Sequence, residues 1–134
     1  MDTITVVQIG LVILFIILTY DRFKPVKNFE QLSETEIKER LKKSKDAVLI
    51  DVRNQYEYET NHIIGAINLP LPQIRRKKVN VPADKEIILY CQTGIRSKQA
   101  ARILRKRYKN LPLAHLNGGL YSWKSETGKS TKKN

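Results

Sequence analysis

The chain of 134 residues has little cysteine, few acidic side chains, and almost no charge in its first twenty residues. Its single cysteine, Cys91, excludes a disulfide framework within the chain and is typical of a protein in a reducing compartment. With 41% apolar and 28% charged residues, the sequence is neither disordered nor of low complexity. The 114 residues that follow the first twenty are enough for one compact domain and too few for two.

The first twenty residues form one long apolar run. From Ile4 to Tyr20 no side chain is charged, and 13 of these 17 residues are Ile, Leu, Val, Phe or Tyr. A helix over Thr3–Tyr20 would span roughly 27 Å, just short of the ~30 Å hydrocarbon core of a bilayer. The run therefore predicts a transmembrane anchor at residues 1–20. One alternative is a buried helix of a soluble protein; another is a signal peptide, although Asp2 stands where its basic region would be.

Almost all charged residues lie after this segment. The net charge is +12 for the whole chain and +13 for residues 21–134. Lysine and arginine are absent before the apolar run, whereas Arg22, Lys24 and Lys27 follow it directly. The positive-inside rule therefore predicts a single-pass protein of the cell membrane whose domain faces the cytoplasm.

We expect a basic juxtamembrane linker at residues 21–28, one domain at residues 29–126, and a flexible basic tail at residues 127–134. Short apolar runs predict four strands, at residues 47–51, 66–69, 86–90 and 113–116. Patterns of capping and amphipathicity predict two helices, from Ser33 to about Lys43 and over residues 97–108. Continuous apolar strands that alternate with helices favour an α/β domain with a mostly parallel sheet.

The stretch from Cys91 to Ser97 lies between a predicted buried strand and a predicted helix. Ligands bind at the carboxyl ends of parallel strands, and the start of a helix presents unpaired N–H groups there. The thiolate is the nucleophilic form of cysteine, and such a positive environment favours it. Gly94 permits a tight turn, Arg96 adds a cation, and Ser97 is placed to cap the helix. The pattern predicts that Cys91 is a nucleophile rather than a small buried core residue.

Four blocks in the same order resemble the rhodanese-like family of sulfurtransferases. They are Asp51-Val52-Arg53, similar to the family's Asp-x-Arg; His62-Ile63-Ile64-Gly65-Ala66-Ile67-Asn68, similar to its His-Ile-x-Gly-Ala-x-Asn; Cys91-Gln92-Thr93-Gly94-Ile95-Arg96-Ser97, similar to its Cys-x-x-Gly-x-Arg-Ser loop; and Leu116-Asn117-Gly118-Gly119 with Trp123 beyond. The resemblance covers residues 29–126. It implies a rhodanese-like three-layer fold, in which helices flank a mostly parallel sheet of about five strands, after one transmembrane helix.

The resemblance also implies a reaction. A small anionic sulfur donor such as thiosulfate, or a protein persulfide, would pass sulfur to Cys91, and a thiol acceptor, which could be a protein, would remove it. Loop N–H groups from Gln92 to Ser97 would stabilise the anionic sulfur, and neither a metal nor an organic cofactor is needed. Gln92 stands where the family often has Arg, which removes one charge that could bind an anionic donor. Asp51 and Arg53 would brace the loop by ion pairing, or form a purely structural pair.

Four other features have structural interpretations. We expect His62 to fix the turn before Gly65, and His115 to be a core residue with satisfied hydrogen bonds. The Gly118–Gly119 pair is expected to meet a backbone requirement near the site, and Trp123 to pack against the core.

Competing functions remain. A cysteine-dependent phosphatase or arsenate reductase has five residues between Cys and Arg, whereas Cys91 and Arg96 are separated by four. A second alternative is a membrane-tethered rhodanese-like module for binding or scaffolding, with little turnover. The basic residues, which include the run 75–78, are not interleaved with aromatic residues that could stack on bases. Their pattern therefore does not favour binding to nucleic acid. It predicts contact with anionic lipid headgroups instead, with mere solubility as the alternative.

Overall fold

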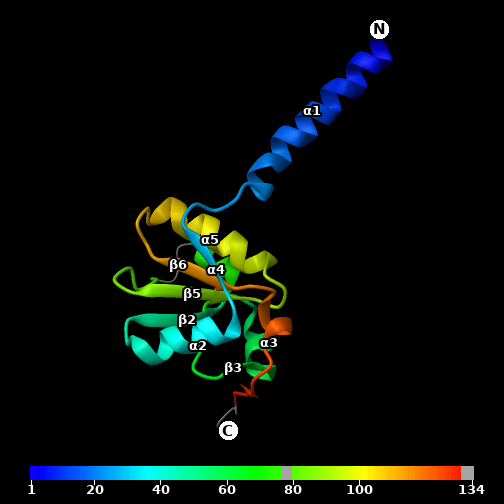
Figure 1. Ribbon diagram of the computed structural model, residues 1–134. Coiled ribbons are helices and arrows are strands. Elements are labelled where there is room, and N and C mark those ends of the chain that lie inside the picture. The colour runs from blue at the N-terminus through cyan, green and yellow to red at the C-terminus, as the bar shows by residue number, and fades with distance from the viewer. Residues whose placement is uncertain (77–79, 131–134) are drawn as a thin grey trace.

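The computed structural model describes residues 1–76 and 80–130, and shows a projecting helix followed by an α/β domain (Figure 1). The helix, α1 (Thr3–Phe23), is capped by Asp2, whose carboxylate accepts a hydrogen bond from the N–H of Thr5 at 2.9 Å. None of the segment Thr3–Tyr20 is buried, and by length and composition it could cross a membrane. The alternative of a core helix in a soluble domain is therefore wrong.

A five-stranded parallel sheet forms the centre of the domain, in the order β1-β6-β5-β2-β4. The strands are β1 (Phe29–Leu32), β2 (Ala47–Asp51), β4 (Ile67–Asn68), β5 (Glu86–Tyr90) and β6 (Leu113–Leu116). The predicted strands at 47–51, 86–90 and 113–116 are confirmed, and the one predicted at 66–69 is shorter. The sequence patterns miss β1 because it is an edge strand that is partly exposed, so it lacks a continuous apolar run.

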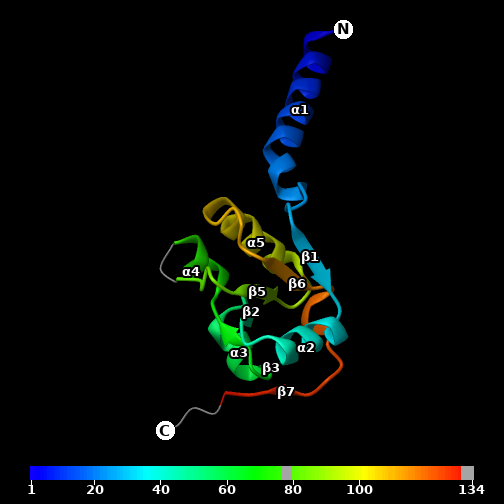
Figure 2. The same cartoon turned by 60° about the vertical axis from the view of Figure 1, so that its left-hand side comes forward.

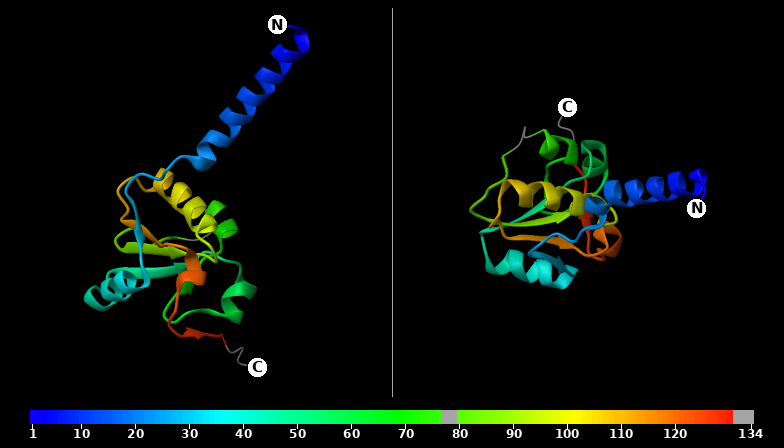
Figure 3. Two further views of the ribbon diagram at one scale, coloured as in Figure 1. Left: turned by 45° about the vertical axis from the view of Figure 1, so that its right-hand side comes forward. Right: turned by 90° about the horizontal axis from the view of Figure 1, so that it is seen from above.

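Helices cover both faces of this sheet, which confirms the three-layer architecture (Figure 3). On one face lie α4 (Leu71–Arg75) and α5 (Ile95–Arg107), and on the other lies α2 (Glu34–Lys43). Side chains of β5 alternate between the two cores: Leu89 packs in the core with α5, and Tyr90 packs in the core with α2. The capping box at the start of α2 is present as predicted, and α5 begins two residues earlier than predicted.

A small second sheet closes the end of the domain (Figure 2). Strand β3 (His62–Ile63), which follows α3 (Gln55–Thr60), pairs antiparallel with β7 (Thr127–Gly128). The expected flexible tail at residues 127–134 is therefore wrong at its start, because β3 offers an edge to which these residues bind. The last four residues of that tail, 131–134, and residues Lys77 and Lys78 of the basic run lie outside the described residues.

The register of the sheet decides what lies at its carboxyl edge. Asp51 at the end of β2 is paired with Tyr90 at the end of β5. Beyond this pair, the N–H of Val52 donates to the carbonyl of Tyr90 at 3.0 Å. The Asp51–Arg53 segment and the loop that starts at Cys91 therefore leave the sheet side by side, and the site forms between them.

Candidate active site

Cys91 lies where β5 ends and the chain turns into α5. Its Sγ accepts hydrogen bonds from the N–H of Gly94 at 3.0 Å and from the N–H of Ser97 at 3.4 Å. Gly94 is the residue that caps α5, and its φ of +108° is one that glycine adopts without strain. Cys91 is only 1% exposed. The sulfur thus accepts hydrogen bonds from two backbone N–H groups at the start of a 13-residue helix, an arrangement that stabilises negative charge.

The turn η1 (Gly119–Ser122) supports this loop from behind. The N–H of Leu120 donates to the carbonyl of Cys91 at 2.8 Å, and the N–H of Tyr121 donates to the carbonyl of Gln92 at 3.3 Å. A Cβ atom on Gly119 would lie 2.5 Å from the carbonyl oxygen of Gln92, and the φ of Gly119 is +66°. This close backbone approach requires glycine and accounts for the Gly-Gly block near the site.

Ser97 does not cap α5, which corrects the sequence prediction. The helix is capped by Gly94, without a side-chain hydrogen bond. Ser97 points into the protein, where its Oγ lies 3.0 Å from the carbonyl of Gly94, 2.9 Å from Nδ1 of His115 and 3.8 Å from Sγ of Cys91. The hydroxyl therefore lies between the sulfur of Cys91 and a buried histidine, and it does not accept a capping hydrogen bond from the first turn of α5.

His115 lies on β6 directly beneath the loop and is 1% exposed. Burial, and to a smaller extent the charge of Lys98, lowers the pKa of His115 to about 4, so its ring is neutral at pH 7. Nδ1 contacts Ser97, but Nε2 has no hydrogen-bond partner among the described residues. The expectation of a fully satisfied core histidine is therefore wrong for one of its two nitrogens. Its ring packs against Phe29, with 4.4 Å between centroids.

Arg96 is not a free cation at the loop. Its guanidinium donates to both carboxylate oxygens of Glu57, at 2.7 and 2.9 Å, a pairing that lowers the pKa of Glu57 and raises that of Arg96. Glu57 is not among the residues predicted for the site, although Asn54 and Glu57 have the spacing of a capping box, and both capping hydrogen bonds are present. Glu57 thus holds the start of α3 and neutralises the arginine of the active-site loop.

Asp51 and Arg53 form a buried ion pair that reaches the loop. Arg53 donates to the Asp51 carboxylate through Nε at 3.1 Å and through Nη2 at 2.8 Å. Arg53 is 3% exposed and Asp51 is 0% exposed. Its Nη1 donates to the side-chain oxygen of Gln92 at 3.1 Å. Gln92 replaces the arginine that is frequent in the family and so removes a charge. Its side chain is also the group through which Arg53 contacts the loop. This geometry favours bracing over a purely structural pair.

Residues of the second block hold the neighbouring backbone. Asn68 donates to the carbonyls of Asp51 and Arg53, at 3.0 and 2.9 Å. The ring of His62 stacks on Tyr58, with 3.9 Å between centroids, and its Nδ1 lies 2.6 Å from the carbonyl of that residue. These contacts are structural and lie away from the sulfur.

The loop residues divide into two groups. Cys91, Gly94 and Ser97 converge on the sulfur, whereas the side chains of Thr93 and Ile95 are exposed, Ile95 by 68%. Across residues 1–76 and 80–130, no three His, Cys, Asp or Glu side chains gather in a way that could hold a metal ion. The described residues thus place one buried cysteine sulfur against two backbone N–H groups at the start of a helix.

Similarity to known proteins agrees with this geometry. The chain is 44% identical over 77 residues to the uncharacterised protein YqhL of Bacillus subtilis, a match that covers 58% of this chain and 60% of that one. It is 32% identical over 110 residues to the tRNA uridine(34) hydroxylase of Hamiltonella defensa, covering 77% of this chain and 30% of the hydroxylase. The structure matches an NAD-dependent persulfide reductase from A. fulgidus with a TM-score of 0.56 at 31% identity, covering 72% of this chain and 16% of the reductase.

The chain spans less than two thirds of the length of each of these proteins, so each match concerns a part of the relative. The sequence profile of the rhodanese-like domain matches residues 33–126, which is more than half of the chain. The chain therefore belongs to the rhodanese-like family.

Proposed function

We propose that the protein is a sulfurtransferase that moves sulfane sulfur through a persulfide on Cys91. The observation that carries the proposal is the position of the Cys91 sulfur, 3.0 and 3.4 Å from two backbone N–H groups at the start of α5. Two hydrogen bonds of this kind stabilise the thiolate before the reaction and the terminal sulfur afterwards. Similarity to a protein whose name includes persulfide reductase supports a persulfide substrate.

The reaction has two displacements. The Cys91 thiolate attacks the outer sulfur of the donor; a new S–S bond forms, the donor's own bond to that sulfur breaks, and the leaving group departs with the electron pair. A thiolate acceptor then attacks the outer sulfur of the Cys91 persulfide, and the Cys91 thiolate is released. No net oxidation takes place, and neither displacement needs a metal or an organic cofactor.

The charges around the loop favour a persulfide over thiosulfate as the donor. Arg96 is neutralised by Glu57, and Gln92 contributes an uncharged amide. Attraction for a dianion therefore depends on backbone N–H groups, whereas a persulfide with one charge or none needs less compensation. The acceptor is a thiol, and a protein thiol fits a site whose rim carries the exposed side chains of Ile95 and Tyr121.

Helix α1 anchors this domain to the membrane in our proposal. The segment Thr3–Tyr20 is apolar and unburied, and the basic residues Arg22, Lys24 and Lys27 follow it. We propose a single-pass protein of the cell membrane with the catalytic domain in the cytoplasm. Digestion of sealed vesicles by an external protease checks the orientation: the domain should be cut in inside-out vesicles and protected in right-side-out ones.

A turnover assay tests the function. Purified full-length protein receives thiosulfate or a low-molecular-weight persulfide, with cyanide or a thiol as acceptor, and a parallel sample receives an aryl phosphate. We expect sulfur transfer with the persulfide as the better donor, no phosphate release, and complete loss in Cys91→Ser. Faster phosphate release would indicate a phosphatase, and absence of turnover with every donor would favour a tethered binding module.

A further inference from the structure

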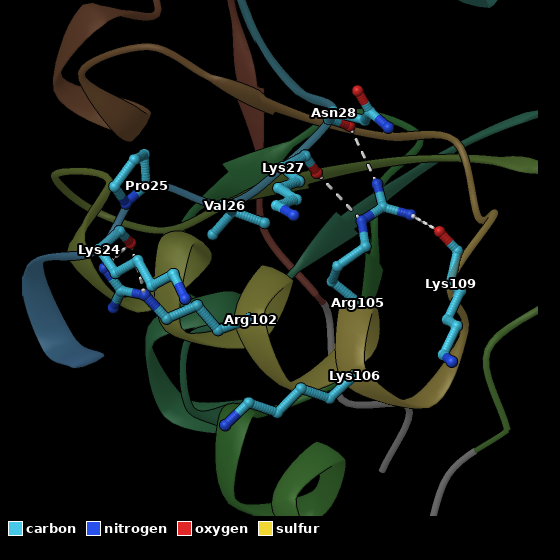
Figure 4. Close-up of a pocket in the computed structure, with 9 residues that line it drawn as sticks. All are labelled: Lys24, Pro25, Val26, Lys27, Asn28, Arg102, Arg105, Lys106 and Lys109. Atoms are coloured by element: carbon cyan, nitrogen blue, oxygen red, sulfur yellow. Dashed lines mark hydrogen bonds between the residues drawn. The ribbon is translucent and has the colours of Figure 1, made fainter.

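A basic groove lies between the linker after α1 and the outer face of α5. It has a volume of about 360 Å³. Figure 4 shows the nine residues that line it, of which six are lysine or arginine and none is acidic: Lys24, Pro25, Val26, Lys27, Asn28, Arg102, Arg105, Lys106 and Lys109. The sulfur site at the start of α5 does not include any of them, so the groove is a separate feature of the molecule.

Two arginines of α5 hold the linker in place and form the wall of the groove. Arg102 donates to the carbonyl of Lys24 at 3.1 and 3.3 Å. Arg105 donates to the carbonyls of Lys27 at 3.1 Å and Asn28 at 2.9 Å, and also to the carbonyl of Lys109 at 3.0 Å (Figure 4). Because both guanidiniums are bound to backbone oxygens, the linker is fixed to α5. Among residues 1–76 and 80–130, no carboxylate forms a salt bridge with either arginine.

The four lysines of the groove likewise have no carboxylate partner within the described part of the chain. Lys24, Lys27, Lys106 and Lys109 are exposed. Like charges held close together repel each other, so the groove is a site where an anion relieves an unfavourable field. Pro25 and Val26 add a small apolar surface beside these charges.

The groove lies at the end of the helix that we propose to cross the membrane. Lys24 is the residue directly after α1, and Arg22 and Phe23 line a hollow with Ile95 and Lys98 at the start of α5. Figure 1 shows α5 between α1 and the sheet, and α2 on the far face. If α1 spans the bilayer, the groove lies at the level of the headgroups, where basic residues next to a membrane helix bind anionic lipids.

We propose that this groove binds the phosphate of an anionic phospholipid headgroup, and that this contact holds α5 and the catalytic loop at the membrane surface. The proposal rests on the membrane anchoring proposed above and goes beyond it, because an anchor alone leaves the orientation of the domain open. A bound headgroup would join the linker lysines to those at the end of α5, and Ile95 would remain near the bilayer through its position beside Arg22 and Phe23.

Chemical labelling of lysines in lipid nanodiscs tests the proposal. Full-length protein is reconstituted into phosphatidylcholine discs with and without phosphatidylglycerol, and a water-soluble acylating reagent is applied before mass spectrometry. We expect at least threefold slower labelling of Lys106 and Lys109 in the anionic discs. Lys43 and Lys45, exposed residues in and after α2 on the opposite face, serve as internal controls and should not change.

Paired variants separate the groove from general attraction of a basic protein. In Lys106→Gln/Lys109→Gln, the protection of Lys24 and Lys27 by anionic lipid should be lost. The matched variant Lys43→Gln/Lys45→Gln, with the same change in charge, should retain it. Equal protection in the two variants would overturn the groove as the binding site.

Other outcomes are equally decisive. Equal labelling of the groove lysines in both kinds of disc, with the protein inserted in each, overturns this proposal and leaves the anchor intact. Failure of the protein to insert in either disc overturns the anchor and the groove proposal together. Protection by inorganic phosphate in neutral discs, equal to that by anionic lipid, would show a site for free anions and contradict the lipid assignment.

Discussion

The two ends of α5 use positive charge in opposite ways. At its start, Arg96 is paired with Glu57, and the sulfur of Cys91 accepts hydrogen bonds from two backbone N–H groups. Towards its end, Arg102 and Arg105 bind linker carbonyls, and lysines face solvent without a carboxylate partner among the described residues. The end that we propose to be catalytic therefore presents fixed dipoles that need no reorganisation, whereas the other end presents side-chain charge suited to the mobile anionic partner that we propose for it.

The largest effect is expected from a substitution that moves the backbone N–H groups away from the sulfur of Cys91. Gly119→Ala places a Cβ atom 2.5 Å from the carbonyl oxygen of Gln92, at a φ of +66°. The loop must shift to accommodate it, and displacement by about 1 Å costs on the order of 100-fold in rate. We expect such a loss in the rate of Cys91 persulfide formation. Gly128→Ala, whose Cβ would meet Ile64 at an ordinary 3.6 Å, is the control; equal rates in the two variants would contradict the account.

The buried histidine below the Cys91 loop makes the stability of the domain depend on pH. Since the folded state lowers the pKa of His115 from 6.5 to about 4, the unfolded state binds more protons between these values. The free energy of unfolding should therefore fall as the pH decreases from 6.5 to 4, by about 3 kcal/mol at most. Fluorescence of Trp123, the single tryptophan, follows unfolding of the full chain in detergent.

His115→Asn should remove most of this acid sensitivity, because asparagine can still contact Ser97 and does not titrate. His62→Asn, which replaces the other histidine, should retain it. A wild-type stability that stays constant between pH 6.5 and 4 would show that burial of the neutral ring is not linked to folding.

Removing the carboxylate partner of Arg96 should leave an unpaired positive charge at the start of α5, as there is towards its end. Glu57→Gln keeps a residue that can complete the capping box of α3 but removes the charge that neutralises Arg96. We expect kcat/KM for thiosulfate, relative to that for an uncharged persulfide donor, to increase about fivefold. Glu59→Gln removes a neighbouring charge that is not paired with Arg96. A donor preference that changes equally in both variants would mean that the pairing does not control selectivity.

The smallest effect on catalysis is expected at the other end of the helix. Arg105→Met retains the aliphatic stem and removes the donors that hold the carbonyls of Lys27 and Asn28. Amide hydrogen exchange in residues 24–28 should quicken about threefold, while persulfide formation stays at the wild-type rate. A change in that rate similar to the change in exchange would show that the two ends are coupled rather than independent.

The sequence predicts those parts of the molecule that depend on local patterns. Buried strands such as β5 are continuous apolar runs, and the loop from Cys91 to Ser97 has a distinctive spacing. The edge strand β1 is missed because half of it faces solvent and its pairing with β6 is visible only in three dimensions. Strand β7 is missed because its two residues become ordered only through an edge supplied by β3.

Residues that act through a distant partner are the hardest to predict. Glu57 has the local signature of a helix cap, but its pairing with Arg96, 39 positions later, follows from the way α3 packs beside the loop. Ser97 has the composition of a cap, yet it turns inward because Gly94 takes that position with a positive φ. The groove likewise combines a basic linker and a basic helix face that are separate in the sequence and meet only when the linker crosses α5.

Sulfur transfer through Cys91 is the central claim, and the intact mass of the protein tests it most directly. Full-length protein is incubated with thiosulfate or a small persulfide, and its mass is measured before and after addition of an acceptor thiol. We expect a gain of about 32 Da, one sulfur atom, which is absent in Cys91→Ser and disappears when the acceptor is added. A mass that does not change with any donor, or a gain that persists in Cys91→Ser, would contradict it.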